Sequence, residues 1–251
     1  MKPLGPGERV AFVIGGAQKG GTTALDGMLR AHPSVSMASI KEPKWFDDDR
    51  RCANAPDFGD CHALFEPADP RRLRGEASPT YCGWPPAAGR IRDYNPAMRW
   101  ILLLRDPAAR AYSQWNMRRS RESDLDAFAE AIDEEIARGA AIAVRNTVGT
   151  SYLSRGFHAA QVERLLALFP HERLLLLRSE RFRREPHAAL DEVHAFLGID
   201  ARPLDAPAEA WVGEYAEPLP PAPRATLVRV FEADVRRLEA ISGWDLAEWL
   251  G

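Results

Sequence analysis

Three runs of apolar residues along the chain have the length of strands and contain no polar position at their centres. They cover 10–14, 99–104 and 173–177, and a weaker run covers 73–77. Continuous apolar runs of this length are typical of parallel strands, because helices cover both faces of a parallel sheet. The pattern therefore predicts four buried strands.

Apolar residues at helical spacing fill the segments around these runs. They predict helices over 24–31, 61–65, 107–121, 125–138, 157–169, 186–197, 222–241 and 246–250. Pro107 suits a first helical turn, Asp124 is an expected N-cap and Gly198 an expected stop. Strands that alternate with helices indicate a three-layer α/β fold, in which helices flank a central parallel sheet. Ligands of such sheets bind beyond the carboxyl ends of the strands.

Length and composition favour a single domain. The chain has 251 residues, of which 45% are hydrophobic, and this suits the core of one α/β domain over 1–251. The length alone would also allow two domains, but the sequence contains no segment typical of a linker between them. Cys52, Cys61 and Cys82 lack the spacing of zinc ligands, and no metal site is expected. We expect free thiols, with a Cys52–Cys61 disulfide as the alternative.

The formal net charge of −3 argues against a nucleic-acid partner, which usually requires a strongly basic face. No apolar run approaches the ~18 residues of a membrane span, and the first residues lack the apolar core of a signal peptide. These absences predict a cytoplasmic protein without a membrane span. They leave the oligomeric state open.

The first predicted strand runs directly into a glycine-rich loop. Phosphate-binding loops follow the pattern G-x-x-x-x-G-K-[ST]. With Gly16 in the first position, Gly21 and Thr23 match, but Thr22 replaces the lysine and Lys19 is the only lysine in the loop. A P-loop-like loop of this kind suits a ligand with one 5′-phosphate and a bridging oxygen better than a nucleoside triphosphate. The alternative is a plain turn that uses glycine for packing.

Further short motifs follow this loop in order. They are His32-Pro33, 41–46, 76–81, 103–107 with Arg110, Tyr112, Ser113 and Trp115, and a patchier segment at 154–157. Together with the loop over 12–25, they resemble the sulfotransferases that use 3′-phosphoadenosine-5′-phosphosulfate (PAPS). The likeness is greatest to the heparan sulfate sulfotransferase branch and its bacterial relatives. It covers most of the chain, and its specific motifs lie in the first half.

The resemblance implies PAPS as the donor, 3′,5′-ADP as its product, and no metal. It implies a set of donor contacts formed by Lys19, Gly20, Gly21, Thr22, Thr23, Arg105, Ser113, Trp211 and Gly213. Arg105 and Ser113 come from R-D-P-x-x-R-x-x-S and would bind the 3′-phosphate, for which a guanidinium fork and a hydroxyl are suitable donors. Asp106 is expected to cap a helix, and Arg110 to form a surface or sheet-packing ion pair.

The same resemblance assigns the catalytic residues. Lys19 would stabilise the bridging oxygen of the leaving nucleotide, and Glu42 would be the base. Lys41 and Lys44 flank Glu42, so they would keep its carboxylate ionised. Lys44 would also bind an anionic acceptor. The alternatives are a solvent-facing loop around Glu42, and a histidine base, although none of the six histidines lies in a segment that matches a histidine-based motif.

Aromatic residues complete the predicted site. Tyr81 and Trp84 are expected to line the acceptor cleft, with a core contact as the alternative for Tyr81. Trp211 and Gly213 would contact the adenine end, where Glu214 occupies the position of an expected cation and Arg224 could substitute for it.

The predicted function is in-line transfer of a sulfuryl group from PAPS to a hydroxyl or amine of a carbohydrate or glycosylated small molecule. The acidic segment 47–60 argues against a highly anionic polymer as acceptor. One alternative is a P-loop kinase, which requires Mg²⁺ and an acidic ligand after a strand, for which Asp106 is the candidate. The other is a catalytically silent nucleotide-binding protein.

Overall fold

The computed structural model describes residues 9–53, 56–65, 69–122, 125–139, 151–203 and 218–251. Its strands are β1 (Phe12–Gly16), β2 (Val35–Met37), β3 (Leu73–Ala77), β4 (Arg99–Leu104) and β5 (Leu174–Arg178). Its helices are α1 (Thr22–Arg30), α2 (Gly59–Ala63), α3 (Pro85–Tyr94), α4 (Pro107–Arg119), α5 (Phe128–Ala137), α6 (His158–Leu166), α7 (Ser179–Arg184), α8 (Pro186–Leu197), α9 (Pro221–Ser242) and α10 (Ala247–Leu250).

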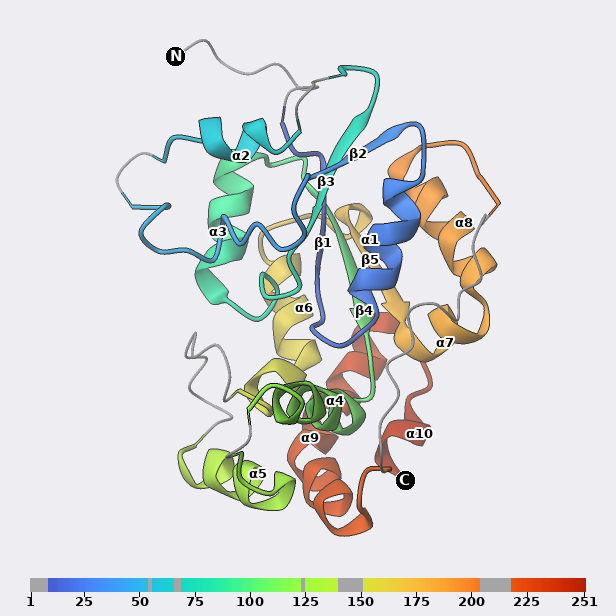
Figure 1. Cartoon of the computed structure of the whole chain (residues 1–251). Coiled ribbons are helices and arrows are strands. Elements are labelled where there is room, and N and C mark those ends of the chain that lie inside the picture. Colours follow the sequence, from blue (N-terminus) through green and yellow to red (C-terminus); the bar gives the residue numbers. More distant parts are fainter. Residues whose placement is uncertain (1–8, 54–55, 66–68, 123–124, 140–150, 204–217) are drawn as a thin grey trace.

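The five strands form one parallel sheet in the order β2-β3-β1-β4-β5 (Figure 1). In the central strand, Phe12 pairs with Gly75 of β3 on one side and with Arg99 of β4 on the other. Position 75 requires glycine because a Cβ there would lie 2.0 Å from the Phe12 ring. Since the strands are parallel, their carboxyl ends meet at one edge of the sheet, and α4 and α9 lie beyond that edge (Figure 1).

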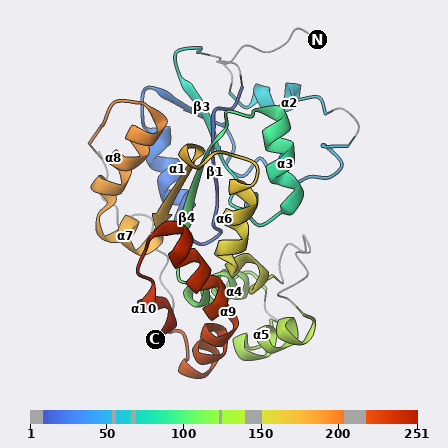
Figure 2. The same cartoon turned by 180° about the vertical axis from the view of Figure 1, so that it is seen from behind.

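Helices cover both faces of the sheet (Figure 2). Alternate residues of β1 point to opposite sides, so Phe12 and Ile14 pack in the core under α1, α7 and α8, whereas Val13 packs in the core under α3 and α6. The prediction of a central parallel sheet flanked by helices is confirmed.

Most predicted elements are present, with differences at their ends and in three additional elements. Strand β2 and helices α3 and α7 were not predicted. The helix predicted from 125 begins at Phe128, and Asp124 lies outside the described residues. Cys52, Cys61 and Cys82 are free thiols, as expected. Within the part of the chain that the structure describes, no helix is long and apolar enough to cross a membrane.

Candidate active site

The glycine loop between β1 and α1 has two residues in the left-handed region, Lys19 with φ 72° and Gly21 with φ 110°. Between them, Gly20 packs against β4 so closely that a Cβ would lie 2.1 Å from the carbonyl oxygen of Leu103. The amide of Gly20 donates to the carbonyl of Ala17 at 2.9 Å. The loop therefore turns tightly into the amino end of α1, where first-turn amides and the helix dipole favour an anion.

Arg105, which follows β4, contacts the backbone of Lys19, which lies in the loop after β1. A guanidinium nitrogen of Arg105 donates to the carbonyl oxygen of Lys19 at 3.3 Å. Nζ of Lys19 lies 3.5 Å from Sδ of Met117 on α4. Arg105 is buried and Lys19 is half-buried. The neighbouring ends of β1 and β4 thus bring the Arg105 guanidinium against the backbone of the glycine loop that carries Lys19.

The other predicted donor contacts differ in exposure. Ser113 is buried on α4, Thr22 is buried at the start of α1, and Thr23 is exposed beside it. Trp211 and Gly213 lie outside the described residues, and the structure adds nothing to their prediction.

Asp106 caps α4, as predicted. Its Oδ1 accepts hydrogen bonds from the amides of Ala108 at 2.8 Å and Ala109 at 3.4 Å. Its Oδ2 forms an ion pair with Arg224 of α9 at 2.8 Å. Arg224 was considered as a substitute cation for the nucleotide. It is held by Asp106, which directly follows Arg105 in the sequence.

Arg110 differs from the predicted surface or sheet-packing ion pair. Its side chain is fully buried, and its guanidinium donates to Oε1 of Gln114 at 2.9 Å and to the carbonyl oxygen of Tyr152. Burial lowers the pKa of Arg110 to about 9. Hydrophobic positions of the sequence alone do not reveal such a contact, because Tyr152 is 42 residues away.

Glu42 lies in a strained segment beyond β2 and β3. Glu42 has φ 56° and Lys44 has φ 52°, and with Lys19 they are the only non-glycine residues with positive φ among those described. The carboxylate of Glu42 forms ion pairs with Nζ of Lys41 at 3.0 Å and of Lys44 at 3.6 Å. The amide of Glu42 donates to the carbonyl of Ala77 at the end of β3 at 2.9 Å. Strained backbone thus gathers at the predicted catalytic residues.

Tyr81 lies in the core and has no exposed surface, which corresponds to the core-contact alternative and not to a residue of an open cleft. Its hydroxyl oxygen accepts hydrogen bonds from the amides of Trp45 at 3.0 Å and Phe46 at 3.3 Å. Tyr81 therefore anchors the segment that carries Glu42. Trp84 is half-buried at the start of α3.

Two charged residues near the site had no assigned role in the sequence analysis. A guanidinium nitrogen of Arg155 donates to Oε1 of Gln18 in the glycine loop. Burial lowers the pKa of Arg155, and the nearby carboxylates of Asp47 and Glu42 oppose this shift. Asp47 is buried, and its Oδ2 accepts a hydrogen bond from the hydroxyl of Thr80 at 2.5 Å. The sequence offered one indication of each residue: Arg155 lies within the motif at 154–157, and Asp47 directly follows the motif at 41–46.

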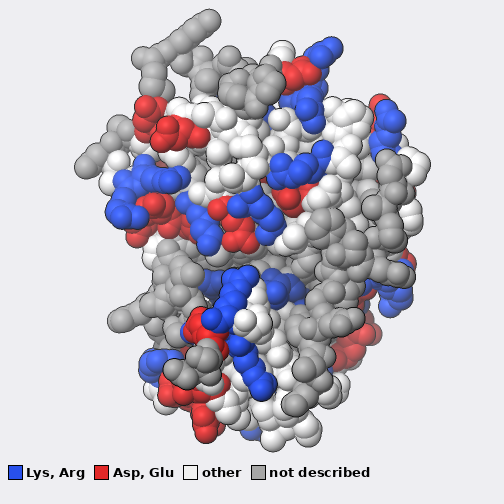
Figure 3. All heavy atoms as spheres, in the orientation of Figure 1, with Lys and Arg blue, Asp and Glu red and all other residues white. Residues whose placement is uncertain are grey.

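Charge is concentrated around this region of the surface. Figure 3 shows Lys and Arg side chains, with carboxylates among them, on both rims of a hollow across the middle of the face seen in Figure 1. In the same orientation, the carboxyl ends of the strands meet α4 at this level. No group of three His, Cys, Asp or Glu side chains suited to a metal ion occurs within the described ranges. The site is therefore an arrangement of cations with a paired carboxylate.

Comparison with known proteins assigns the family. The sulfotransferase domain family matches residues 10–212. Human heparan sulfate glucosamine 3-O-sulfotransferase 3B1 is 30% identical over 193 residues, which are 74% of this chain and 45% of that protein. Human bifunctional heparan sulfate N-deacetylase/N-sulfotransferase 3 is 31% identical over 195 residues, 75% of this chain and 22% of that protein. A sulfotransferase crystal structure from Alicyclobacillus acidocaldarius has 30% identity and a TM-score of 0.80, covering 96% of this chain and 98% of that one.

The chain belongs to the sulfotransferase family, and it is a sulfotransferase enzyme rather than a phosphotransferase. It spans less than half the length of the two human relatives, so their whole activities do not transfer to it. The predicted resemblance to heparan sulfate sulfotransferases and their bacterial relatives is confirmed.

Proposed function

We propose that this enzyme transfers a sulfuryl group from PAPS to a hydroxyl or amine of a carbohydrate or a glycosylated small molecule. The observation that carries the proposal is the contact between the Arg105 guanidinium and the backbone carbonyl of Lys19, which joins the end of β4 to the glycine loop after β1. Membership of the sulfotransferase family supports PAPS as the donor.

The residues present fit a nucleotide with phosphates at two positions. At the 5′ end, Gly20 packs so closely on β4 that any Cβ would collide with Leu103, and this close packing sets the path of the loop into the amino end of α1, where an anion is favoured. At the 3′ end, Arg105 supplies a charged donor and Ser113 a neutral hydroxyl donor. When bound, PAPS supplies an activated sulfuryl group attached to a nucleotide leaving group.

In this mechanism, Lys19 and Glu42 act on opposite sides of the transfer. The ammonium of Lys19 neutralises the negative charge that develops on the leaving oxygen. Glu42 accepts the proton of the attacking acceptor group, since it is a half-exposed carboxylate within hydrogen-bond reach of solvent. Lys41 and Lys44 hold the Glu42 carboxylate in place through their ion pairs.

Arg155 and Asp47 have supporting roles in this proposal. Arg155 connects the loop, through Gln18, to the region of Glu42 and Asp47, whose charges act on the Arg155 guanidinium. The hydrogen bond from Thr80 holds Asp47 in place. The two residues therefore fix the acceptor side of the site relative to the donor loop.

A carbohydrate acceptor is supported by the relatives named for heparan sulfate and its glucosamine residues. Lys44 is exposed beside Glu42 and would contact an acidic group of such an acceptor. Trp84, half-buried beside Tyr81, offers an aromatic surface for a sugar ring.

Calorimetric titration with 3′,5′-ADP, and in parallel with ATP and Mg²⁺, tests the proposal. We expect micromolar binding of 3′,5′-ADP, weak binding of ATP, and a loss of about 10- to 100-fold in 3′,5′-ADP affinity for Arg105→Ala, because a charged hydrogen bond is removed. Arg92→Ala, which removes an exposed charge on α3, is the matched control and should bind normally. Tight ATP binding without preference for a 3′-phosphate would overturn the proposal.

A further inference from the structure

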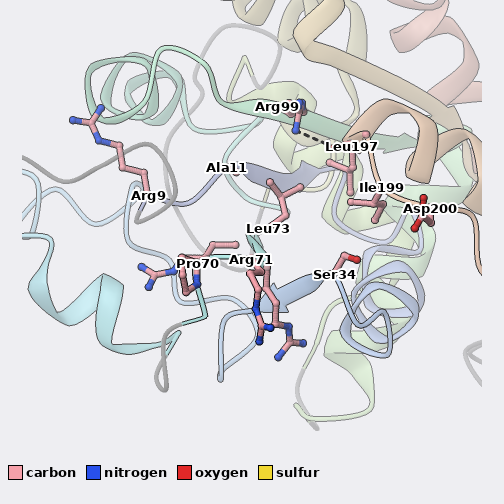
Figure 4. A pocket seen from close by; sticks show the side chains of 13 residues that line it. Arg9, Ala11, Ser34, Pro70, Arg71, Leu73, Arg99, Leu197, Ile199 and Asp200 are labelled. Atoms are coloured by element: carbon pink, nitrogen blue, oxygen red, sulfur yellow. Dashed lines mark hydrogen bonds between the residues drawn. The ribbon is translucent and has the colours of Figure 1, made fainter.

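A second basic site lies at the opposite end of the sheet from the candidate active site. A cavity of about 440 Å³ opens where β1, β3 and β4 begin, and its lining includes Arg9, Arg71, Arg72, Arg74 and Arg99. We call it the arginine pocket (Figure 4). The distance from Arg99 to Arg105 along β4 is six residues, or about 20 Å at the usual strand rise. The arginine pocket is therefore separate from the site described above.

The positive charge of the arginine pocket is only partly balanced by the residues described around it. Arg9, Arg72 and Arg99 donate to the carbonyl oxygens of Tyr94, Val35 and Leu197, and among the described residues none of these three arginines forms an ion pair. Carbonyl oxygens satisfy N–H groups but carry no net charge.

The carboxylates near the pocket are few. Arg71 forms an exposed ion pair with Asp69 at 2.9 Å, and Asp200 is the only acidic residue in the described lining. Burial lowers the pKa of Arg99, and the neighbouring charge of Arg173 lowers it further. Positive charges are thus crowded here, and an anion would relieve their repulsion.

The side chains of the pocket combine charge with an apolar wall. In Figure 4, Arg71 and Arg99 lie on either side of Leu73, whereas the Arg9 guanidinium extends away. Leu197 and Ile199 lie beside Leu73 in the lining. The volume lies within the range of small-molecule sites, which combine apolar walls with a few charged groups.

Strand spacing and register set the separation of Arg72 and Arg99. Arg72 precedes β3 and Arg99 begins β4, with β1 between those strands. Phe12 pairs with both Gly75 and Arg99, so Arg72 lies three residues, or about 10 Å, upstream of the level of Arg99. Together with two strand spacings of ~4.8 Å, this offset places the two backbones about 14 Å apart. A single phosphate cannot contact two guanidinium groups anchored so far apart as well as a ligand with two separated anionic groups can.

We propose that the arginine pocket binds a small organic molecule with two phosphate or sulfate groups, held between Arg72 and Arg99 with its carbon skeleton against Leu73. This site is distinct from the donor site and does not depend on the proposed function. A ligand at the starts of β1, β3 and β4 would stabilise the sheet on which the candidate active site is built.

Calorimetry with fructose 1,6-bisphosphate, against a sodium sulfate blank of equal ionic strength, tests this inference. The double variant Arg72→Gln/Arg99→Gln should bind it at least tenfold more weakly than the unmodified protein. Arg50→Gln/Arg92→Gln, which removes two exposed arginine charges elsewhere, should leave its affinity unchanged. Titration with 3′,5′-ADP shows whether each variant retains a folded nucleotide site, and Arg72→Lys/Arg99→Lys tests whether charge alone suffices.

Three results would overturn the inference. The first is no heat above the sulfate blank. The second is an equal loss of affinity in the two double glutamine variants, which would indicate a general charge effect. The third is displacement of fructose 1,6-bisphosphate by saturating 3′,5′-ADP, which would place it in the donor site. Replacement of fructose 1,6-bisphosphate by a sugar bis-sulfate distinguishes the two oxyanion sources.

Discussion

Nε2 of His158 lies 2.9 Å from the carbonyl oxygen of Arg105. A carbonyl only accepts hydrogen bonds, so Nε2 carries the proton of the ring. His158 is buried at the start of α6, and burial lowers its pKa to about 4. A neutral imidazole thus fixes the backbone where β4 ends and where Arg105 meets the loop of Lys19.

We expect the protein to lose stability as the pH falls through the pKa of His158. The unfolded ring takes up a proton near pH 6.5 and the folded ring only near pH 4. The contribution of the neutral His158 ring to the free energy of unfolding is therefore complete above pH 6.5, and it is lost as the pH falls from 6.5 to 4. Its full size is about 3 kcal/mol. Urea unfolding at pH 7 and pH 4.5 should show a smaller pH dependence for His158→Gln. An unchanged pH dependence would contradict the lowered pKa.

We expect Gly20→Ala to abolish tight binding of 3′,5′-ADP and to destabilise the fold by roughly 2 kcal/mol or more, because the new Cβ would lie 2.1 Å from a carbonyl oxygen of β4. The matched control is Gly89→Ala in α3, where nothing lies within 4 Å of the added Cβ. That change should stabilise by about 0.5–1 kcal/mol through helix propensity. Equal behaviour of the two variants in calorimetry and thermal unfolding would refute the packing argument.

Replacement of Lys44 separates its backbone strain from its charge. At φ 52°, glycine is preferred by about 1 kcal/mol, so Lys44→Gly should be more stable than Lys44→Ala by that amount. The same pair of changes at Glu134, an exposed position in α5, should give the opposite order. Chemical denaturation of the four variants provides the comparison, and a glycine penalty at position 44 would show that its backbone is relaxed.

We expect Glu42→Gln to lower kcat by about 10²- to 10⁴-fold, which is the usual contribution of a general base. Its affinity for 3′,5′-ADP should remain unchanged, because the proposed mechanism assigns Glu42 to the acceptor and not to the nucleotide. Release of 3′,5′-ADP from PAPS in the presence of a carbohydrate acceptor measures kcat, and calorimetry measures affinity. Glu122→Gln removes an exposed carboxylate and is the control. Full turnover by Glu42→Gln would exclude it as the base.

Periodicity and length predicted the sheet well where strands are long. β4 is continuous in Trp100–Leu104 and has the predicted bounds, and β3 also matches its prediction. β2 contains three residues, Val35–Met37, too few for any period to emerge. α3 begins with two prolines and includes Gly89, so its sequence resembles a loop although Ile91 and Tyr94 pack in the core.

Only those parts of the candidate site that follow from strand order could be predicted from the sequence. Lys19 and Arg105 both follow strands, and parallel strands bring such residues to one edge. The motif at 154–157 includes Arg155, but the contact of Arg155 with Gln18, 137 residues away, depends on long-range packing that the motif does not specify. The direction of the Tyr81 ring was likewise undetermined, because an aromatic residue after a strand suits either a core or a cleft.

Strand β1 pairs with β4, which places Phe12 beside Arg99, although the ribosome synthesises the two strands far apart in time. The loop of Lys19 emerges first, and Arg105 follows 86 residues later. At about 5–20 residues per second, that interval is on the order of ten seconds. During it, the nascent chain carries only half of the proposed nucleotide site, so under this proposal the donor nucleotide can assist folding only after β4 has left the exit tunnel.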